Sequence, residues 1–288
     1  MVTTLWSALT VGAIYVLTAL GYNIVWLTAG VFNFAQAQFV MVGTFVAFAS
    51  TEQLHVAIPV GFLLGAAVGF ALGAVEERLA MRPIAGKGAH GELVTTVGAA
   101  LALDGIAEVI WGSEPKSVPF FGPTHGITLA GGRVLPDQIL LIGLAVVLSA
   151  ALMGWSRWSL TGNVSLAAAE DRESAMLRGV NIRRFTLLAV AVAGGVAGLL
   201  GLVVAPDTYA VYNLGDSLVA YAFLALTIGG FGSYGGALVG GLVAGVVQSF
   251  TEYFWNSNVS GLTMLVLLLV VLAIRPTGIF GAQKLRTA

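Results

Sequence analysis

The chain has 288 residues, of which 58% are apolar and only 9% are charged. Ordinary soluble domains are roughly 45–50% apolar and about 25% charged, so a soluble chain of this composition would expose a large apolar surface to water. The composition therefore excludes a soluble globular enzyme, and the ample apolar surface also excludes intrinsic disorder. The 13 basic residues nearly balance the 14 acidic ones, and no basic block suggests a nucleic-acid partner.

Several kinds of chemistry are also excluded. The chain contains no cysteine, which removes disulfides, thiolate catalysis and cysteine-based metal sites. Its histidines, His55, His90 and His125, are far apart and lack the spacing of metal ligands. No phosphate-binding loop is present, because Gly86-Lys87 lacks both the upstream glycine and a following Ser or Thr. We therefore expect no catalytic residues, metal or cofactor in this chain, and no ATP hydrolysis by it.

Hydrophobic segments long enough to cross a bilayer recur along the sequence. A spanning helix needs about 20 mostly apolar residues, and continuous apolar runs favour helices over a barrel, whose strands alternate apolar and polar residues. We expect an all-α polytopic membrane protein, a glycine-rich bundle of about eight to nine helices that forms one transmembrane domain over residues 1–288. The expected spans are residues 5–27, 32–50, 57–75, 93–111, 138–155, 186–205, 217–231, 235–254 and 259–274.

Two of these segments are the weakest candidates for a full crossing. Residues 32–50 contain the amides Asn33, Gln36 and Gln38. Residues 217–231 are short and have a Gly-Gly pair at their end. Either segment could be a broken or re-entrant helix. The first of the nine segments lacks the basic flank of a signal peptide and is too long for one, so we expect a transmembrane helix there.

Positive charge predicts the orientation of the later spans, since cytoplasmic loops carry an excess of Lys and Arg. Residues 76–92, 156–185 and 275–288 hold all but two of the basic residues and are expected inside. The Gly/Pro-rich loop at 112–137 holds the other two and is then outside. No Lys or Arg precedes residue 56, so charge does not determine the side of the N-terminus.

The 38 glycines are far more than the usual roughly 7% of a chain. Two series recur at every fourth residue: Gly61, Gly65, Gly69 and Gly73 in the first, and Gly232, Gly236 and Gly240 in the second. Small residues at this spacing let two helix backbones approach closely in lipid. We expect close helix packing within the bundle, with a subunit interface as the alternative.

The cytoplasmic stretch 163–185 departs most from its surroundings. Residues 167–178 are rich in helix formers, and Gly179 with Asn181 suits the end of a helix. Acidic residues lie toward the start of this helix, as the helix dipole prefers, and they are Glu170, Asp171 and Glu173. The expected amphipathic helix could lie on lipid headgroups or dock into a partner protein, and the residues alone favour neither.

Polar side chains at membrane depth are costly and are candidates for function. Asp104 and Glu108 are spaced i, i+4 on one helix face and could couple transport to an ion. The alternative is that Glu108 lies at the outer interface while Asp104 faces a hydrated interior. Asn33, Gln36 and Gln38 must face protein, water or a solute, and hydrogen bonds between helices are the plainest explanation for them.

Five short motifs in a fixed order carry a resemblance to a known family. They are Asn-Phe-Ala-Gln at 33–36, Gly-Ser-Glu-Pro at 112–115, Ala-Glu-Asp-Arg-Glu at 169–173 with Leu177, Gly179 and Asn181, Gly-Gly-Phe-Gly-Ser-Tyr-Gly-Gly at 229–236, and Arg-Pro-Thr-Gly-Ile-Phe-Gly at 275–281. With them, essentially the whole chain resembles the permease subunits of bacterial ABC importers for branched-chain amino acids. One departure is that Ala37 and Gln38 stand where this family often has Gly and Glu.

The resemblance implies a multi-pass permease of the bacterial inner membrane that is not an enzyme. It implies three protein partners: cytoplasmic ATP-binding subunits that use ATP, a second permease subunit, and an extracytoplasmic solute-binding protein. It favours docking onto the ATPase for the helix near residues 163–185, with Glu170, Asp171, Glu173 and Gly179 as coupling residues. The family also has members for urea, short amides and other small organic solutes.

Asn33, Gln36 and Gln38 are our candidates for the solute path. An apolar amino acid carries two opposite charges, and neutral amides can replace water at both without trapping either, as a path must bind weakly. Two other classes of function remain as alternatives. One is a secondary transporter that uses Asp104 and Glu108, and the other is a passive channel lined by the glycine-rich helices.

Overall fold

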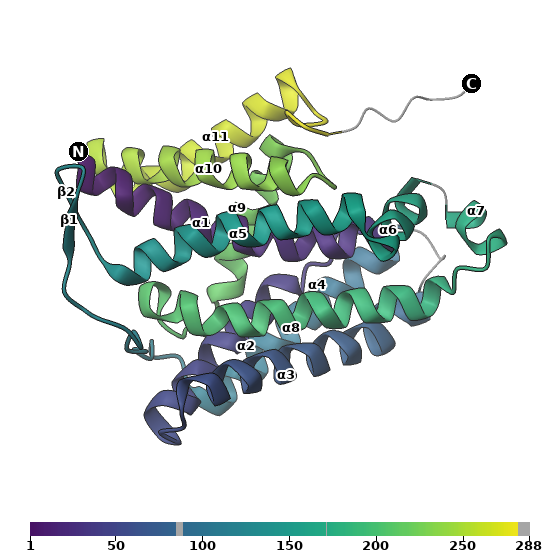
Figure 1. The fold of residues 1–288 in the computed structure, drawn as a ribbon, viewed down its shortest axis with the longest axis horizontal. Coiled ribbons are helices and arrows are strands. Elements are labelled where there is room, and N and C mark those ends of the chain that lie inside the picture. Colours follow the sequence, from purple (N-terminus) through teal and green to yellow (C-terminus); the bar gives the residue numbers. More distant parts are fainter. Residues whose placement is uncertain (85–88, 171, 282–288) are drawn as a thin grey trace. The chain divides into compact units, whose positions relative to one another are not determined.

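The computed structural model describes residues 1–84, 89–170 and 172–281, so Asp171 lies outside the described residues (Figure 1). The described residues form eleven α-helices, two π-helical turns, one 3₁₀ turn and a two-stranded hairpin. The α-helices are α1 Val2–Ala29, α2 Gln36–Phe48, α3 Ile58–Glu76, α4 Ala89–Trp111, α5 Pro136–Trp158, α6 Leu160–Glu170, α7 Arg172–Leu177, α8 Ile182–Thr208, α9 Leu214–Gly229, α10 Tyr234–Phe254 and α11 Ser257–Ile274. The other elements are η1 Ala49–Gln53, η2 Glu77–Met81, η3 Arg82–Ile84, β1 Ile127–Leu129 and β2 Gly132–Val134.

Seven helices of the described chain are long and apolar enough to cross a membrane. They are α1, α3 with its continuation to Ile84, α4, α5, α8, α10 and α11. The expected all-α polytopic fold is confirmed. The two weakest segments are both short, since α2 has 13 residues and α9 has 16. The helix expected from residue 32 starts only at Gln36 because Asn33 Oδ1 accepts a hydrogen bond from Ala35 N at 2.9 Å, which holds a turn there.

Two local expectations need correction. The loop 112–137 contains the antiparallel hairpin β1–β2, whose turn residues Ala130 and Gly131 have φ of 52° and 82°. Asn181 does not end a helix. Its side chain accepts a hydrogen bond from Arg184 N at 3.1 Å and thereby caps the start of α8.

The chain divides into two compact units, which are described separately. Unit 1 comprises Met1–Asn23, Thr124–Gly154 and Ala220–Ala288, and unit 2 comprises Ile24–Pro123 and Trp155–Val219. The division falls within α1, α5 and α9, so these three helices contribute to both units.

In unit 2, α8 lies alongside both α2 and α3 (Figure 1). The buried residues of α3 are Gly61, Gly65, Gly69, Gly73 and Glu76. A Cβ atom built on Gly69 would overlap the carbonyl oxygen of α8 residue Gly194 and would lie only 3.1 Å from the Cα of another, Gly198. The first glycine series therefore forms the contact at which the backbones of α3 and α8 meet.

In unit 1, glycines bring α10 against both α1 and α9. A Cβ on Gly240 would overlap the carbonyl oxygen of Ala225 in α9, and one on Gly236 would lie 2.8 Å from the carbonyl carbon of Gly229. On α1, a Cβ on Gly12 would lie 2.9 Å from the Cα of Leu242 in α10. Within α10, Gly236 and Gly240 of the second series pack against α9, and further glycines outside the series pack against α1. Gly232, which was expected on the same helix face, instead lies in the turn before α10 with φ of 80°.

Candidate functional site

The three amides at the start of α2 all point into unit 2. Asn33, Gln36 and Gln38 are 0%, 1% and 1% exposed. Asn33 Nδ2 donates to Glu76 Oε2 at 2.8 Å, and its other amide atom holds the turn before α2. This amide therefore ties the start of α2 to the end of α3.

Gln36 ties α2 to α8. Its Nε2 atom donates to the carbonyl oxygen of Ala193 at 3.1 Å, while its Oε1 atom has no hydrogen-bond partner among the described residues. Gln36 thus helps to position α2 against the glycine-rich part of α8.

Gln38 brings together acids from two other helices. Its Nε2 atom lies 3.5 Å from Asp104 Oδ2 on α4 and 3.3 Å from Asp216 Oδ1 on α9. Asp104 is buried, whereas Asp216 is exposed. The chain therefore gathers one amide and two carboxyl groups that are far apart in sequence.

Asp104 and Glu108 have different environments although both lie on α4. Asp104 is 7% exposed and contacts Gln38, whereas Glu108 is exposed. Residues four apart on a helix are offset by about 40°, and on this helix that offset separates the inner face from the outer one. Asp104 joins the polar cluster around Gln38, in which the other carboxyl group belongs to Asp216.

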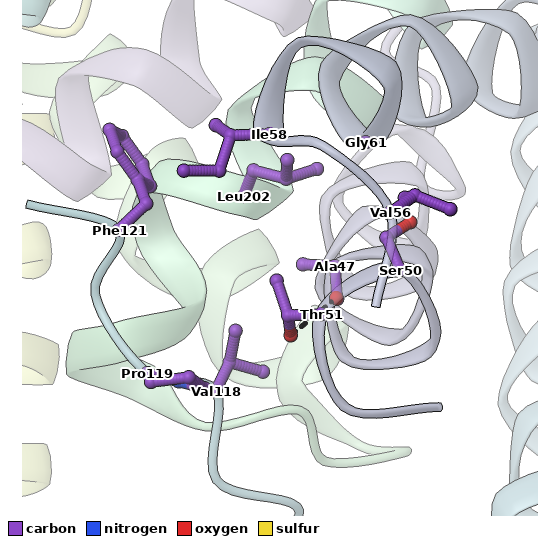
Figure 2. A pocket seen from close by; sticks show the side chains of 10 residues that line it. All are labelled: Ala47, Ser50, Thr51, Val56, Ile58, Gly61, Val118, Pro119, Phe121 and Leu202. Atoms are coloured by element: carbon purple, nitrogen blue, oxygen red, sulfur yellow. Dashed lines mark hydrogen bonds between the residues drawn. The ribbon is translucent and has the colours of Figure 1, made fainter. Parts of the chain in front are cut away.

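Unit 2 also contains a small pocket near the ends of several elements (Figure 2). Ten residues line it: Ala47, Ser50, Thr51, Val56, Ile58, Gly61, Val118, Pro119, Phe121 and Leu202. Thr51 Oγ1 donates to the carbonyl oxygen of Ala47, about one turn earlier in the chain, at 2.9 Å. Most of the ten lining residues are apolar. The free space has room for about one water-sized sphere, which is too little for an amino acid.

The stretch 163–185 contains the end of α6 and the whole of α7, followed by a tight turn at Gly179. Gly179 has φ of 87°, and the N–H of Val180 donates back to the carbonyl of Ala175 at 3.2 Å. This is the pattern of a glycine-terminated helix. Glu170 ends α6 and Glu173 lies in α7. At the end of α7, Met176 and Leu177 are 51% and 89% exposed.

Motifs 229–236 and 275–281, which are apart in sequence, meet in unit 1. The N–H groups of Ile279 and Phe280 donate to the carbonyls of Ile228 and Gly229 at 2.8 and 2.9 Å. The second motif therefore satisfies backbone groups that the end of α9 leaves free. The close approach requires glycine, because a Cβ on Gly278 would lie 2.5 Å from the Cα of Gly230.

Two polar contacts in unit 1 were not predicted from the sequence. Asn23 accepts a hydrogen bond from Gly232 N at 2.9 Å and donates to the carbonyl of Ser233 at 3.0 Å, which fixes the turn before α10. Tyr15 donates to Gln248, which in turn donates to Glu252 at 2.9 Å. Asn23 could have been found as a lone amide inside an apolar span, but no spacing rule links Tyr15 to the other two.

These features define a class of protein: a polytopic, glycine-packed helical membrane protein with polar side chains gathered inside its bundle. Residues 4–273 match the family model described as the permease component of branched-chain amino acid transport systems. The match covers most of the chain, so the chain belongs to this family of membrane permeases. It is accordingly a multi-pass protein of the cell's inner membrane.

Curated relatives match along nearly the whole chain. The high-affinity branched-chain amino acid transport system permease protein BraD of Pseudomonas aeruginosa is 29% identical, with 96% of this chain and 95% of the relative covered. The corresponding protein LivH of Escherichia coli K12 is 28% identical, with 97% and 95% covered. A probable branched-chain amino acid transport permease protein LivH of Methanocaldococcus jannaschii is 27% identical, with 93% and 89% covered.

Proposed function

We propose that this chain is the permease subunit of an ABC importer that moves branched-chain or similar apolar amino acids into the cell. The observation that carries the proposal is the match of residues 4–273 to the permease family, together with full-length relatives named for this transport. The sequence contains no phosphate-binding loop, so ATP would be used by separate cytoplasmic subunits. We assign no enzymatic role to the chain.

The proposal includes a second permease subunit and an extracytoplasmic solute-binding protein. The ATPase would dock on the cytoplasmic stretch 156–185, with Glu170, Asp171, Glu173 and Gly179 as coupling residues. What supports docking over lipid binding is the exposed apolar end of α7 beside the sharp turn at Gly179. A rigid turn next to an exposed apolar surface suits insertion into a groove on a partner.

We propose that the solute passes the start of α2, beside Asn33, Gln36 and Gln38. All three amides are buried and hydrogen-bonded within unit 2, so the path beside them would be closed in this state. Opening would exchange these contacts for contacts with the solute, which neutral amides allow without strong trapping.

The solute is tested by purifying the chain with its ATPase subunits, partner permease and binding protein. ATP hydrolysis by the complex is measured with leucine, isoleucine, valine, urea or acetamide as the added solute. We expect the three amino acids to stimulate hydrolysis and the other two to leave it unchanged. Stimulation by urea or acetamide alone would assign the chain to the small-amide members of the family.

Variants of the coupling segment are expected to reduce transport without preventing the loaded binding protein from binding to the complex. Glu170→Lys inverts the charge of a proposed coupling residue, and Gly179→Val places a β-branched residue at φ of 87°, where it is strained. Leucine uptake should fall while the loaded binding protein still binds the complex. Gly131→Val is the matched control, because Gly131 has φ of 82° in the β1–β2 turn and lies far from this segment in sequence. Normal uptake in both coupling variants would exclude these roles.

Thiol labelling tests the path beside α2. Because the chain has no cysteine, Asn33→Cys or Gln36→Cys introduces a single thiol. We expect a water-soluble thiol reagent to modify these positions during ATP turnover and to leave them unmodified at rest, when they are buried. If neither position reacts during turnover, the amides are structural and the solute passes elsewhere.

A further inference from the structure

A carboxyl pair in unit 2 has no role in the proposed solute path or in docking of the ATPase. Asp104 of α4 and Asp216 of α9 both accept from Nε2 of Gln38, at 3.5 and 3.3 Å. Gln38 is 1% exposed and Asp104 is 7% exposed, so the amide and one carboxyl group lie inside the bundle. Asp216, in contrast, is exposed on the described chain.

The neighbouring backbone is shaped for this contact. A Cβ atom on Gly215 would lie 2.7 Å from both Cδ and Nε2 of Gln38, so any larger residue would force the amide to shift from its present place. The segment before α9 is held by a pair of backbone hydrogen bonds between Lys116 and Ala210, at 2.9 and 3.0 Å. Gln38 and Asp216 therefore meet because a glycine and an ordered segment bring them together.

The cluster is short of hydrogen-bond donors. Gln38 Oε1 and Asp104 Oδ1 are buried and have no hydrogen-bond partner among the described residues. The three helices that supply the cluster contain no Lys or Arg. Two carboxyl groups and an amide oxygen can accept several hydrogen bonds, and the one amide NH₂ group satisfies only part of this capacity. The chemistry that complements the cluster is a compact cation with several N–H donors.

We propose that Gln38, Asp104 and Asp216 form a subsite for the ammonium group of the transported amino acid. This rests on the proposed function, because an amino acid is a solute that carries such a group. An ammonium has three donors and one positive charge, which match the free acceptors and offset the negative charge. The amide already donates to both carboxyl groups and so limits their hold on the solute, which must leave again.

The subsite also lies where a delivered solute would enter. If positive charge sets the orientation as expected, α4 runs from the inside toward the outside and Asp104 lies about two turns before its outer end at Trp111. The exposed Asp216 follows the outer loop that precedes α9. A solute released outside would meet Asp216 first and the buried Asp104 second.

Chemical replacement of the Asp216 charge tests the proposal. The variant Asp216→Cys is assembled with partner subunits free of reactive thiols, and leucine uptake into liposomes is measured. Alkylation with iodoacetate restores a carboxylate at this position, whereas iodoacetamide adds a neutral group of nearly the same size. We expect uptake to fall about tenfold in the variant, to recover with iodoacetate and to stay low with iodoacetamide. The control is Glu108→Cys, an exposed acid on α4, which should keep normal uptake throughout.

A second variant addresses the buried acid. Asp104→Asn keeps the shape of the side chain and should lower uptake about tenfold, while ATP hydrolysis still responds to the loaded binding protein. Equal uptake after the two alkylations, or normal uptake in Asp104→Asn, would overturn the subsite. Uptake that disappears when Na⁺ is replaced by choline would also overturn it, because the pair would then bind an inorganic cation. If the unmodified complex takes up no leucine, the proposed function itself fails.

Discussion

Replacing Gly69 with leucine is expected to remove most of the folded permease from the membrane. The new Cβ would overlap the carbonyl of Gly194, and the remaining atoms of leucine have no space between two helix backbones. Overpacking a well-packed interior costs about 1–3 kcal/mol, and here backbone rather than a flexible side chain blocks the space. The measurement is the yield and thermal stability of monodisperse permease in detergent.

Gly98→Leu is the matched control for this substitution. Gly98 lies within α4, and a Cβ built there meets nothing within 4 Å. It is exposed, so leucine at this position adds apolar surface without a clash. We expect normal yield for Gly98→Leu. Normal yield for Gly69→Leu as well, with altered solute selectivity, would show instead that the glycine face lines the path.

Replacing Asn33 with leucine is expected to destabilise the permease more than the same change at Gln36. Asn33 donates to the buried carboxyl group of Glu76, whereas Gln36 donates to a backbone carbonyl. A buried carboxyl group that loses its donor costs about 3 kcal/mol, and a lost neutral hydrogen bond costs about 1 kcal/mol. Thermal unfolding of the purified variants compares the two changes.

A second substitution tests whether the Glu76 carboxyl group, left without its donor, causes the loss of stability in Asn33→Leu. In the Asn33→Leu background, Glu76→Leu removes the carboxyl group that lacks a donor, and most of the lost stability should return. Glu76 is 6% exposed at the end of the α3 glycine face, so leucine is compatible with its surroundings. Equal destabilisation by Asn33→Leu and Gln36→Leu, with no recovery from Glu76→Leu, would contradict this account of the contact.

The membrane-spanning helices were predictable because length and apolar composition determine them. The two short helices were harder to define, and their ends depend on local contacts. Asn33 delays α2 through a side-chain turn, and α9 ends where Gly230 takes φ of 101°. Neither the turn at Asn33 nor the positive φ of Gly230 can be detected from the hydropathy of the sequence. The hairpin in the loop 112–137 was missed because its strands have only three residues each.

The polar cluster was predictable only in part. Gln38 and Asp104 are conspicuous as polar residues within apolar segments. Asp216 was not among the candidate residues, and spacing cannot show that three helices bring these residues together. Glu108 was paired with Asp104 because the i, i+4 rule places two residues on roughly one face. That rule does not say where the buried face of α4 ends.

Accumulation of leucine against a gradient is the most direct test of the central claim. The chain is reconstituted into liposomes with its partner permease and ATPase subunits, with ATP and the binding protein on their respective sides. We expect leucine inside to rise above its outside concentration only when ATP, the ATPase subunits and the binding protein are all present. Accumulation driven by a Na⁺ or proton gradient without ATP would show a secondary transporter. Equilibration without accumulation would show a channel, and either result would contradict the account.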